Sequence, residues 1–306
     1  MSEHITHIAI YEDTIRLISH SDEFHQAFKV SLQNQPDAGL MSAGARGNHL
    51  HAVPFLEQTR DIWSQRKPGD GTEEKIAAAI GWLSHRAIDL KVKSIQLKDG
   101  EITDVAISKD ENDIYQDAVT FDKVYGRGKK HSHSSKVHLS EATLAYSMSG
   151  HPAAQLLHTD QIEALVVSMV QQNLMSYHQF HANTKDPEAW LNEYPDHYQK
   201  LSEDLNTYIE AFTHPDPLKM KVYIEDFNFY NEQDELLLLV RELQNEGNTK
   251  IDLQNALQKA ENESQYAQGL RRSYLFNKWA SDFFQKEMDK NTLYDKLENL
   301  HEPFRL

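Results

Sequence analysis

Apolar residues recur at intervals of three and four through most of this 306-residue chain, which is the spacing of one face of an α-helix. The clearest such segment follows Pro68-Gly-Asp-Gly71, with Thr72 as the expected N-cap and acidic Glu73 and Glu74 in the first turn, and it runs to about Leu97. Only 12 Gly and 9 Pro are present, too few for a many-turned β-sandwich. The sequence therefore predicts an all-α fold.

The same periodicity predicts an N-terminal helix that continues through Phe24 and Phe28, and a second helix after Pro54. We expect residues 35–51 to interrupt the pattern, and residues 101–136 to be irregular with short helices. Later helices are expected at 158–181, 188–212, 232–246, 250–268 and 270–299. Since no linker stands out, residues 1–306 are predicted to form a single helical domain, with a core at 1–183 and an additional helical layer at 184–306.

Composition excludes several classes of function. The chain has no cysteine, which rules out thiolate catalysis and cysteine zinc sites and fits a reducing compartment. Its net charge of −16 disfavours nucleic-acid binding through a basic surface. There is no apolar run long enough for a transmembrane segment and no visible signal peptide, so we expect a soluble, cytoplasmic protein. Its 17 histidines make metal binding a hypothesis that spacing must decide.

One motif in the long helix carries chemistry. Gly81, His85 and Asp89 are spaced four residues apart and therefore line one face of the helix. An imidazole and a carboxylate one turn apart can share a metal ion, or the carboxylate can orient the imidazole. The glycine would let another backbone or a ligand approach them. The alternative is a buried hydrogen bond between His85 and Asp89 that joins two helices.

This motif, after an N-terminal Thr6-His7-Ile8 segment, resembles the zinc-dependent phospholipase C family, which is related to the helical P1-type nucleases. The resemblance covers about residues 4–175. It implies a multi-helix bundle with extra C-terminal helices in this chain, and a zinc cluster held by His, Asp and Glu. Such a cluster activates water against a phosphoester.

Residue by residue, the resemblance implies the following ligands. His7 matches the early histidine of the family, and His85 and Asp89 match the helix motif. Either Asp37 or His49 stands in place of an early Gly-Pro-Asp element. The last ligands would be His158 and Glu163, with Asp89 or Glu163 as the catalytic carboxylate that orients water.

The chain departs from the family pattern at two places. Lys91-Val-Lys93 stands where the family has a further histidine near a proline, and the amine of Lys93 would repel a cation or pair with Asp89. His158 and Glu163 are five residues apart, one more than in the family motif, so they lie about 140° apart around an ideal helix.

The sequence therefore predicts a zinc-dependent phosphoester hydrolase, phospholipase C-like or a degenerate form of it, acting on a small-molecule or lipid phosphoester. The first alternative is a non-catalytic helical binding protein that keeps the fold without the full metal cluster. A second is a single-metal enzyme such as a hydroxylase, held by His7, His85 and Asp89. Two other features are interpreted as structural rather than functional. His131, His133 and His138 are expected in an exposed loop, and the aromatic residues at 223–230 in the core.

Overall fold

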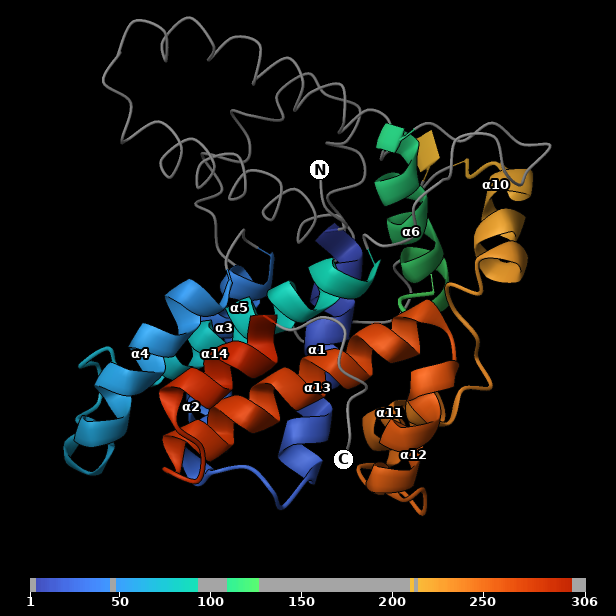
Figure 1. Ribbon diagram of the computed structural model, residues 1–306. Coiled ribbons are helices and arrows are strands. Elements are labelled where there is room, and N and C mark those ends of the chain that lie inside the picture. The colour runs from blue at the N-terminus through green and yellow to red at the C-terminus, as the bar shows by residue number, and fades with distance from the viewer. Residues whose placement is uncertain (1–3, 45–47, 93–108, 127–209, 212–213, 299–306) are drawn as a thin grey trace, which may run out of the picture. The chain divides into compact units, whose positions relative to one another are not determined.

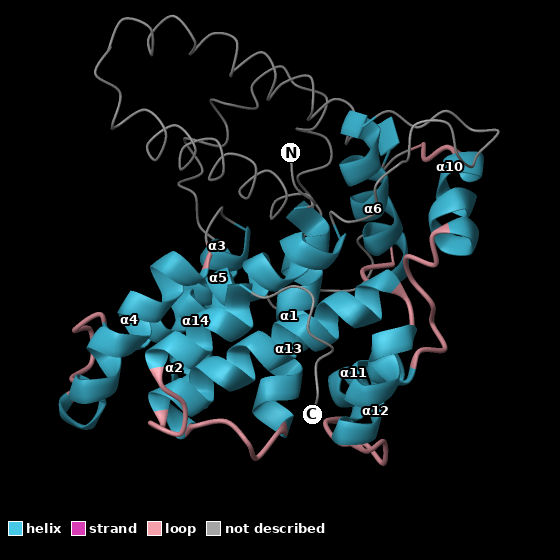
Figure 2. Cartoon of the chain, in the orientation of Figure 1, coloured by secondary structure: helices cyan, strands magenta, loops and turns pink. Residues whose placement is uncertain are grey.

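The computed structural model describes residues 4–44, 48–92, 109–126, 210–211 and 214–298. Within these ranges the chain is made of helices joined by loops, and no strand occurs among them (Figure 2). The predicted all-α class is therefore confirmed. The predicted helix at 158–181 and nearly all of that at 188–212 lie outside the described residues.

The helices before residue 124 are α1 (His4–His20), α2 (Gln26–Asn34), α3 (Pro36–Gly44), α4 (His49–Ile62), the 3₁₀ turn η1 (Trp63–Gln65), α5 (Thr72–Val92) and α6 (Lys109–Lys123). Four of them, α1, α4, α5 and α6, have 14 residues or more. The later helices are α10 (Pro217–Lys221), the π-helical turn η3 (Val222–Asp226), α11 (Glu235–Glu246), α12 (Leu253–Lys259), the 3₁₀ turn η4 (Ala260–Asn262), α13 (Gln265–Phe284) and α14 (Lys290–Glu298).

Local chemistry explains why α5 begins where the sequence predicts. Gly69 and Gly71 have φ values of 76° and 81°, which form the tight turn before the helix. The Asp70 carboxylate accepts a hydrogen bond from the backbone N–H of Thr72 at 2.9 Å. Glu73 in the first turn pairs with Arg66 at 2.9 Å. The Asp70 carboxylate thus satisfies a backbone N–H at the start of α5, and the acidic Glu73 lies near the positive end of the helix dipole. These contacts define where α5 begins.

The chain divides into two compact units, and neither is continuous in sequence. One comprises Met1–Thr6, Gly44–Arg46 and Leu97–Asp226, and the other comprises His7–Ala43, Gly47–Gln96 and Phe227–Leu306. The second unit joins helices from both ends of the chain. The predicted division at residue 183 stays a prediction, because that position lies outside the described residues.

The second unit is built around α5, against which α2, α4 and α13 pack (Figure 1). Both α5 and α13 are long and bury apolar side chains along much of their length. Buried polar contacts also join the helices. Asn277 on α13 donates to the Ser84 hydroxyl on α5 at 3.0 Å, and Thr14 on α1 donates to the Ser273 hydroxyl on α13 at 2.7 Å. The helix that carries the predicted motif is thus the centre of this unit.

In the first unit, α6 contacts α10 and η3. Asp117 on α6 accepts a hydrogen bond from the backbone N–H of Thr6 at 2.8 Å, and the hydroxyls of Thr6 and Thr120 lie 2.9 Å apart. The rings of Tyr115 and Tyr223 stack with centroids 6.3 Å apart. This unit therefore combines buried polar bonds with an aromatic contact.

Two segments expected to be irregular, the second with short helices, contain regular helices. Residues 36–44 form α3 in the segment expected to break the pattern, and α4 begins at His49 rather than after Pro54 because the Asn48 side chain caps it through the Leu50 N–H at 2.8 Å. Residues 109–123 form α6. Its periodicity is weak because buried positions hold Gln116, Asp117 and Thr120, which a hydrophobicity pattern assigns to solvent.

Three predicted helices are divided. The expected N-terminal helix is interrupted after His20, and α2 starts afresh at His25, whose Nδ1 accepts from the Ala27 N–H at 3.1 Å. The segment 250–268 ends its first helix at Lys259, and Ser264 caps α13. The segment 270–299 is divided between α13 and α14. In each case a polar capping residue starts a new helix within a continuous apolar pattern.

The predicted core role of the aromatic residues near 223–230 is confirmed for the buried Tyr223, Phe229 and Tyr230.

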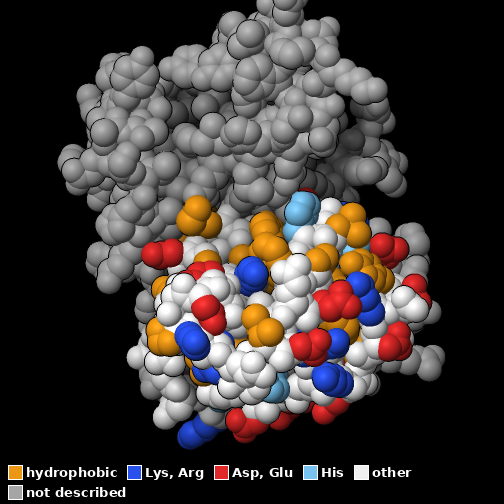
Figure 3. Space-filling view, turned by 90° about the vertical axis from the view of Figure 1, so that its left-hand side faces the viewer, with side chains coloured by type: hydrophobic (Ala, Val, Ile, Leu, Met, Phe, Trp, Pro, Cys, Tyr) orange, Lys and Arg blue, Asp and Glu red, His pale blue; other side chains and the backbone are white. Residues whose placement is uncertain are grey.

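Among the described helices, none has both the length and the apolar character needed to cross a lipid bilayer. The visible described surface in Figure 3 mixes acidic, basic and small apolar groups.

Candidate metal centre

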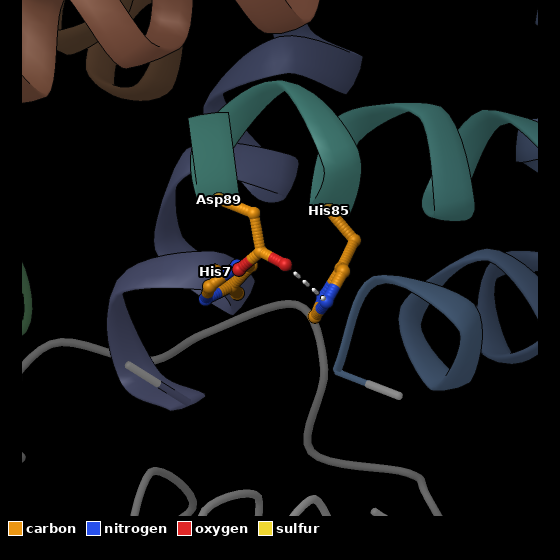
Figure 4. Close-up of side chains that lie close together, drawn as sticks. All are labelled: His7, His85 and Asp89. Carbon is orange, nitrogen blue, oxygen red and sulfur yellow. Dashed lines mark hydrogen bonds and ion pairs between the residues drawn. The ribbon is translucent and has the colours of Figure 1, made fainter. Parts of the chain in front are cut away.

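Three predicted ligands meet in the second unit. His85 and Asp89 project from one face of α5 toward His7, which comes from α1 (Figure 4). One ligand atom from each of the three residues can be chosen so that all lie within 4.8 Å of one another. Both histidines are almost fully buried, and the Asp89 side chain is 19% exposed. Among the described residues, this is the group of histidines and acids that could hold a metal ion.

The first glycine of the motif permits a close approach of two helices. A Cβ atom added at Gly81 would collide with the carbonyl oxygen of Gly39 and lie 2.8 Å from the backbone nitrogen of Ala43. Because Gly81 has no side chain, the backbone of α3 lies directly against α5. The expectation that this glycine admits another backbone is confirmed.

The approach of α3 fixes the orientation of His85. The Nδ1 atom of His85 lies 2.9 Å from the carbonyl oxygen of Ala43, in the last turn of α3. A carbonyl only accepts, so Nδ1 carries the proton and donates it. The other ring nitrogen, Nε2, is then directed toward Asp89. A backbone bond to one imidazole nitrogen is the usual way in which a metal-ligating histidine is oriented.

Asp89 lies between the two imidazoles. Its Oδ1 is 3.1 Å from Nε2 of His7, and its Oδ2 is 3.4 Å from Nε2 of His85. The two rings themselves are close, with centroids 4.3 Å apart and planes inclined by 30°. One carboxylate therefore faces a nitrogen of each ring.

This arrangement is favourable when a proton or a metal ion lies between Nε2 of His85 and the Asp89 carboxylate. With its proton on Nδ1, a neutral His85 presents a lone pair at Nε2 to a carboxylate oxygen that also carries lone pairs. Two lone pairs at that separation repel unless a proton or a metal ion lies between them. Burial by itself would raise the pKa of Asp89, but the imidazoles of His85 and His7 outweigh burial and hold the pKa well below its ordinary value.

The donor set fits a transition-metal ion. Two imidazole nitrogens and one carboxylate oxygen are ligands that zinc accepts, and three protein ligands leave a position for water. Neighbouring ligands in a tetrahedral zinc site are about 3.4 Å apart for bonds of about 2.1 Å. Each imidazole nitrogen lies near that separation from one oxygen of Asp89, His7 at 3.1 Å from Oδ1 and His85 at 3.4 Å from Oδ2. Filling the site with two positive imidazoles instead would bring two like charges together.

Two of the other predicted ligands, Asp37 and His49, do not join this group. Asp37 is exposed in the first turn of α3. His49 is buried on α4, where its Nε2 lies 3.1 Å from Oε1 of Glu298 on α14. His158, Glu163 and Lys93 lie outside the described residues, so the predicted roles of these three residues stay predictions.

The sequence did not reveal the carbonyl of Ala43 as part of the site. Every residue has a backbone carbonyl, so no side-chain pattern marks the one that orients His85. The indirect signal was Gly81, which lies on the same helix face as His85. Because glycine has no side chain, it allows another backbone to approach this face closely.

Comparison with known proteins adds no family to this description. The chain matches none of the protein-family models, none of the curated proteins and none of the solved structures. The argument for function therefore rests on the residues of the chain and on the geometry of His7, His85 and Asp89.

Proposed function

We propose that this protein is a metal-dependent phosphoester hydrolase whose ion is held by His7, His85 and Asp89. The observation that carries the proposal is the hydrogen bond from His85 Nδ1 to the carbonyl oxygen of Ala43. Because of this bond, the other ring nitrogen, Nε2, faces the Asp89 carboxylate, and a metal ion between the two would be bound by both. A buried histidine whose only role was to join helices would more simply share its proton with Asp89.

The phosphoester class comes from the resemblance of Gly81-x-x-x-His85-x-x-x-Asp89 and His7 to zinc-dependent phospholipase C. A bound zinc ion would lower the pKa of a bound water and neutralise charge that develops on a phosphoester. The protein residues hold and orient: Ala43 fixes His85, and Asp89 faces both imidazoles. The substrate would be a small-molecule or lipid phosphoester, and Glu163 remains the proposed second carboxylate.

A second candidate is a single-metal enzyme of another class. Two histidines and one carboxylate with open positions are also the ligand set of non-haem iron oxygenases. The meeting of His7, His85 and Asp89, with Asp37 and His49 elsewhere, favours this candidate. The identity of the bound metal distinguishes the two, since zinc supports hydrolysis and iron supports oxygen chemistry.

The test is metal content of the purified, tag-free protein by inductively coupled plasma mass spectrometry, after growth with zinc and iron supplied. We expect near-stoichiometric zinc that is lost in the His85→Ala and Asp89→Ala variants. His20→Gln is the matched control, because His20 is an exposed histidine at the end of α1. Circular dichroism of each variant shows that loss of metal is not loss of fold.

Hydrolytic activity is then measured with the zinc-loaded protein. The substrates are bis(p-nitrophenyl) phosphate, which reports phosphodiester hydrolysis, and p-nitrophenyl phosphate, which reports phosphomonoester hydrolysis. Hydrolysis that disappears in Asp89→Ala and persists in His20→Gln supports the proposal. Stoichiometric iron in place of zinc supports the second candidate. Protein that stays metal-free after zinc addition and dialysis overturns both, leaving a helical binding protein.

A further inference from the structure

Arg86 differs from the other arginines that the structure describes. With the residues that the structure describes, it makes no hydrogen bond, ion pair or ring contact, although its side chain is half-buried and its Nε atom is shielded from solvent. The remaining arginines of the described residues all have partners, namely Arg16, Arg60, Arg66, Arg241, Arg271 and Arg272. In a chain of net charge −16, a guanidinium without an acid is unexpected.

A second donor without a partner lies one turn before Arg86 on the same face of α5. The indole Nε1 of Trp82 is buried and makes no hydrogen bond. Residues four apart on a helix are neighbours, so Trp82 and Arg86 lie on the same face of α5. Both groups can only donate hydrogen bonds, since indole and guanidinium nitrogens offer no acceptor.

The surroundings of this pair come from α4. The His51 and Phe55 rings lie with centroids 5.4 and 5.5 Å from the Trp82 ring. The Nδ1 of His49 is also buried without a partner. Burial lowers the pKa of His49, and the positive charge of Arg86 acts in the same direction, which places the two side chains within electrostatic reach. Three shielded nitrogens without partners therefore occur where α4 packs on α5.

The same protein shows what a satisfied pair of this kind is like. Arg66 lies over the ring of Trp63, with its Cζ 3.5 Å from the centroid, and its Nε pairs with the Glu73 carboxylate. That guanidinium is neutralised within the chain. Buried polar groups in folded proteins are nearly always paired, so the exceptions at Trp82 and Arg86 call for an acceptor that the described residues do not supply.

We infer that Trp82 and Arg86 form a binding site for the phosphate group of an organic ligand, beside His49 and on the helix stripe next to that of His85 and Asp89. A phosphate offers several acceptor oxygens and a negative charge, which match an indole N–H and a planar guanidinium. This inference rests on the proposed function in one respect: the organic ligand would be the substrate or product of the His7–His85–Asp89 site.

The test uses the full-length protein treated with EDTA, so that phosphate cannot bind through a metal ion. Inorganic phosphate and glycerol 3-phosphate are titrated separately at constant ionic strength, with binding followed by ¹H–¹⁵N NMR of the indole N–H groups. The chain has four tryptophans, and the Trp82 signal is assigned by its absence in Trp82→Phe. We expect the Trp82 signal to shift and saturate, with glycerol 3-phosphate bound at least as tightly as inorganic phosphate.

The variants separate this site from a general effect of charge. Arg86→Met should weaken binding by about ten-fold or more, since it removes a charge-assisted hydrogen bond. Arg66→Met is the matched control, because it removes an arginine that also lies against a tryptophan, and it should leave the affinity unchanged. The spectrum of each variant also shows whether it is folded.

The outcomes distinguish this site from the metal centre. Absence of a saturable Trp82 shift, or equal weakening by Arg86→Met and Arg66→Met, overturns the inference. Binding of inorganic phosphate that exceeds binding of glycerol 3-phosphate overturns the assignment to an organic ligand. If phosphate binds as expected while the protein takes up no metal, the proposed hydrolase fails and the anion site stands. If zinc binds and Arg86→Met leaves phosphate affinity unchanged, the proposed anion site fails and the metal centre stands.

Discussion

The His85 ring on α5 donates from Nδ1 to the carbonyl oxygen of Ala43 on α3, across a distance of 2.9 Å. This bond exists because Gly81, one turn earlier on α5, leaves room for the α3 backbone. It also satisfies a carbonyl in the last turn of α3, where intrahelical partners run out. Helix packing and the orientation of a candidate metal ligand therefore depend on the same contact.

The Gly81→Ala variant tests this dependence. In a helix, alanine is normally more stable than glycine by about 1 kcal/mol. Here the added Cβ would overlap backbone atoms of α3, and overpacking of that kind costs about 1–3 kcal/mol or more. We expect a net loss in the free energy of unfolding, measured by urea denaturation, together with weaker zinc binding.

The control is Ala78→Gly on the same helix, where Ala78 is half-buried. It should destabilise the protein by the helix-propensity difference of about 1 kcal/mol and leave zinc binding unchanged. A Gly81→Ala variant as stable as the wild type would show that α3 does not press on α5.

The sequence predicted the motif helix well because its signals are local. The spacing of Gly81, His85 and Asp89 follows from helix geometry alone, and the start of α5 follows from the turn before it. Pairing of His7 with Asp89 is a contact across 82 residues, which no local pattern could establish. It was expected only because the family resemblance suggested that both bind metal.

The sequence failed where tertiary contacts decide the structure. The segment that forms α3 contains two glycines and serves as a helix because it packs against α5 and Tyr11, not because of its propensity. In α6, the buried Asp117 accepts from the backbone of Thr6. Its position looks solvent-exposed in a hydrophobicity pattern, so only short helices were expected in this segment, not the 15-residue α6.

A buried hydrogen bond between α5 and α13 should be measurable by a double-mutant cycle. The side-chain amide of Asn277 donates to Ser84 at 3.0 Å and to the carbonyl of Ser273 at 2.9 Å, with Asn277 and Ser84 fully buried. We expect Asn277→Ala to cost about 2–3 kcal/mol, because it leaves a cavity and removes both bonds. Ser84→Ala should cost about 1 kcal/mol.

The double variant should cost less than the sum of the two single variants by about 0.5–1.5 kcal/mol, the coupling energy of one buried hydrogen bond. Urea denaturation of the four proteins gives the value. Strict additivity would mean that the bond contributes nothing to the packing of α13 on α5.

His25 should make the stability of α2 depend on pH. Its Nδ1 accepts a hydrogen bond from the Ala27 N–H, so the ring must be unprotonated at that atom, and burial lowers the pKa of His25 below its ordinary value of 6.5. A histidine with a lowered folded-state pKa contributes stability that is present above the unfolded pKa and is lost as pH falls through the folded pKa. Acidification below about pH 6.5 should therefore destabilise the protein.

His25→Asn is the matched variant, because asparagine is a good N-cap that does not titrate. The difference in unfolding free energy between wild type and His25→Asn should shift in favour of the variant by up to about 1 kcal/mol between pH 7.5 and pH 5. Using this difference cancels the titration of the other histidines. A constant difference over that range would show that the His25 cap does not titrate.

Metal binding should stabilise the fold, since His7 and Asp89 join α1 to α5 and the ion would bind the folded chain. With zinc at about 100 times its dissociation constant, the free energy of unfolding should rise by about 2.7 kcal/mol, and EDTA should reverse the gain. His7→Gln, His85→Gln and Asp89→Asn should each abolish the zinc-dependent shift in melting temperature. His20→Gln, on the exposed end of α1, should retain it.

The variants also separate the metal site from a purely structural His–Asp contact. If the ion binds at His7, His85 and Asp89, each variant removes the zinc response, whatever it does to the metal-free protein. If the cluster only joins helices, each variant lowers the melting temperature of the metal-free protein, and zinc changes neither variants nor wild type. A zinc response that survives Asp89→Asn would assign the ion to another site, since this carboxylate faces both imidazoles.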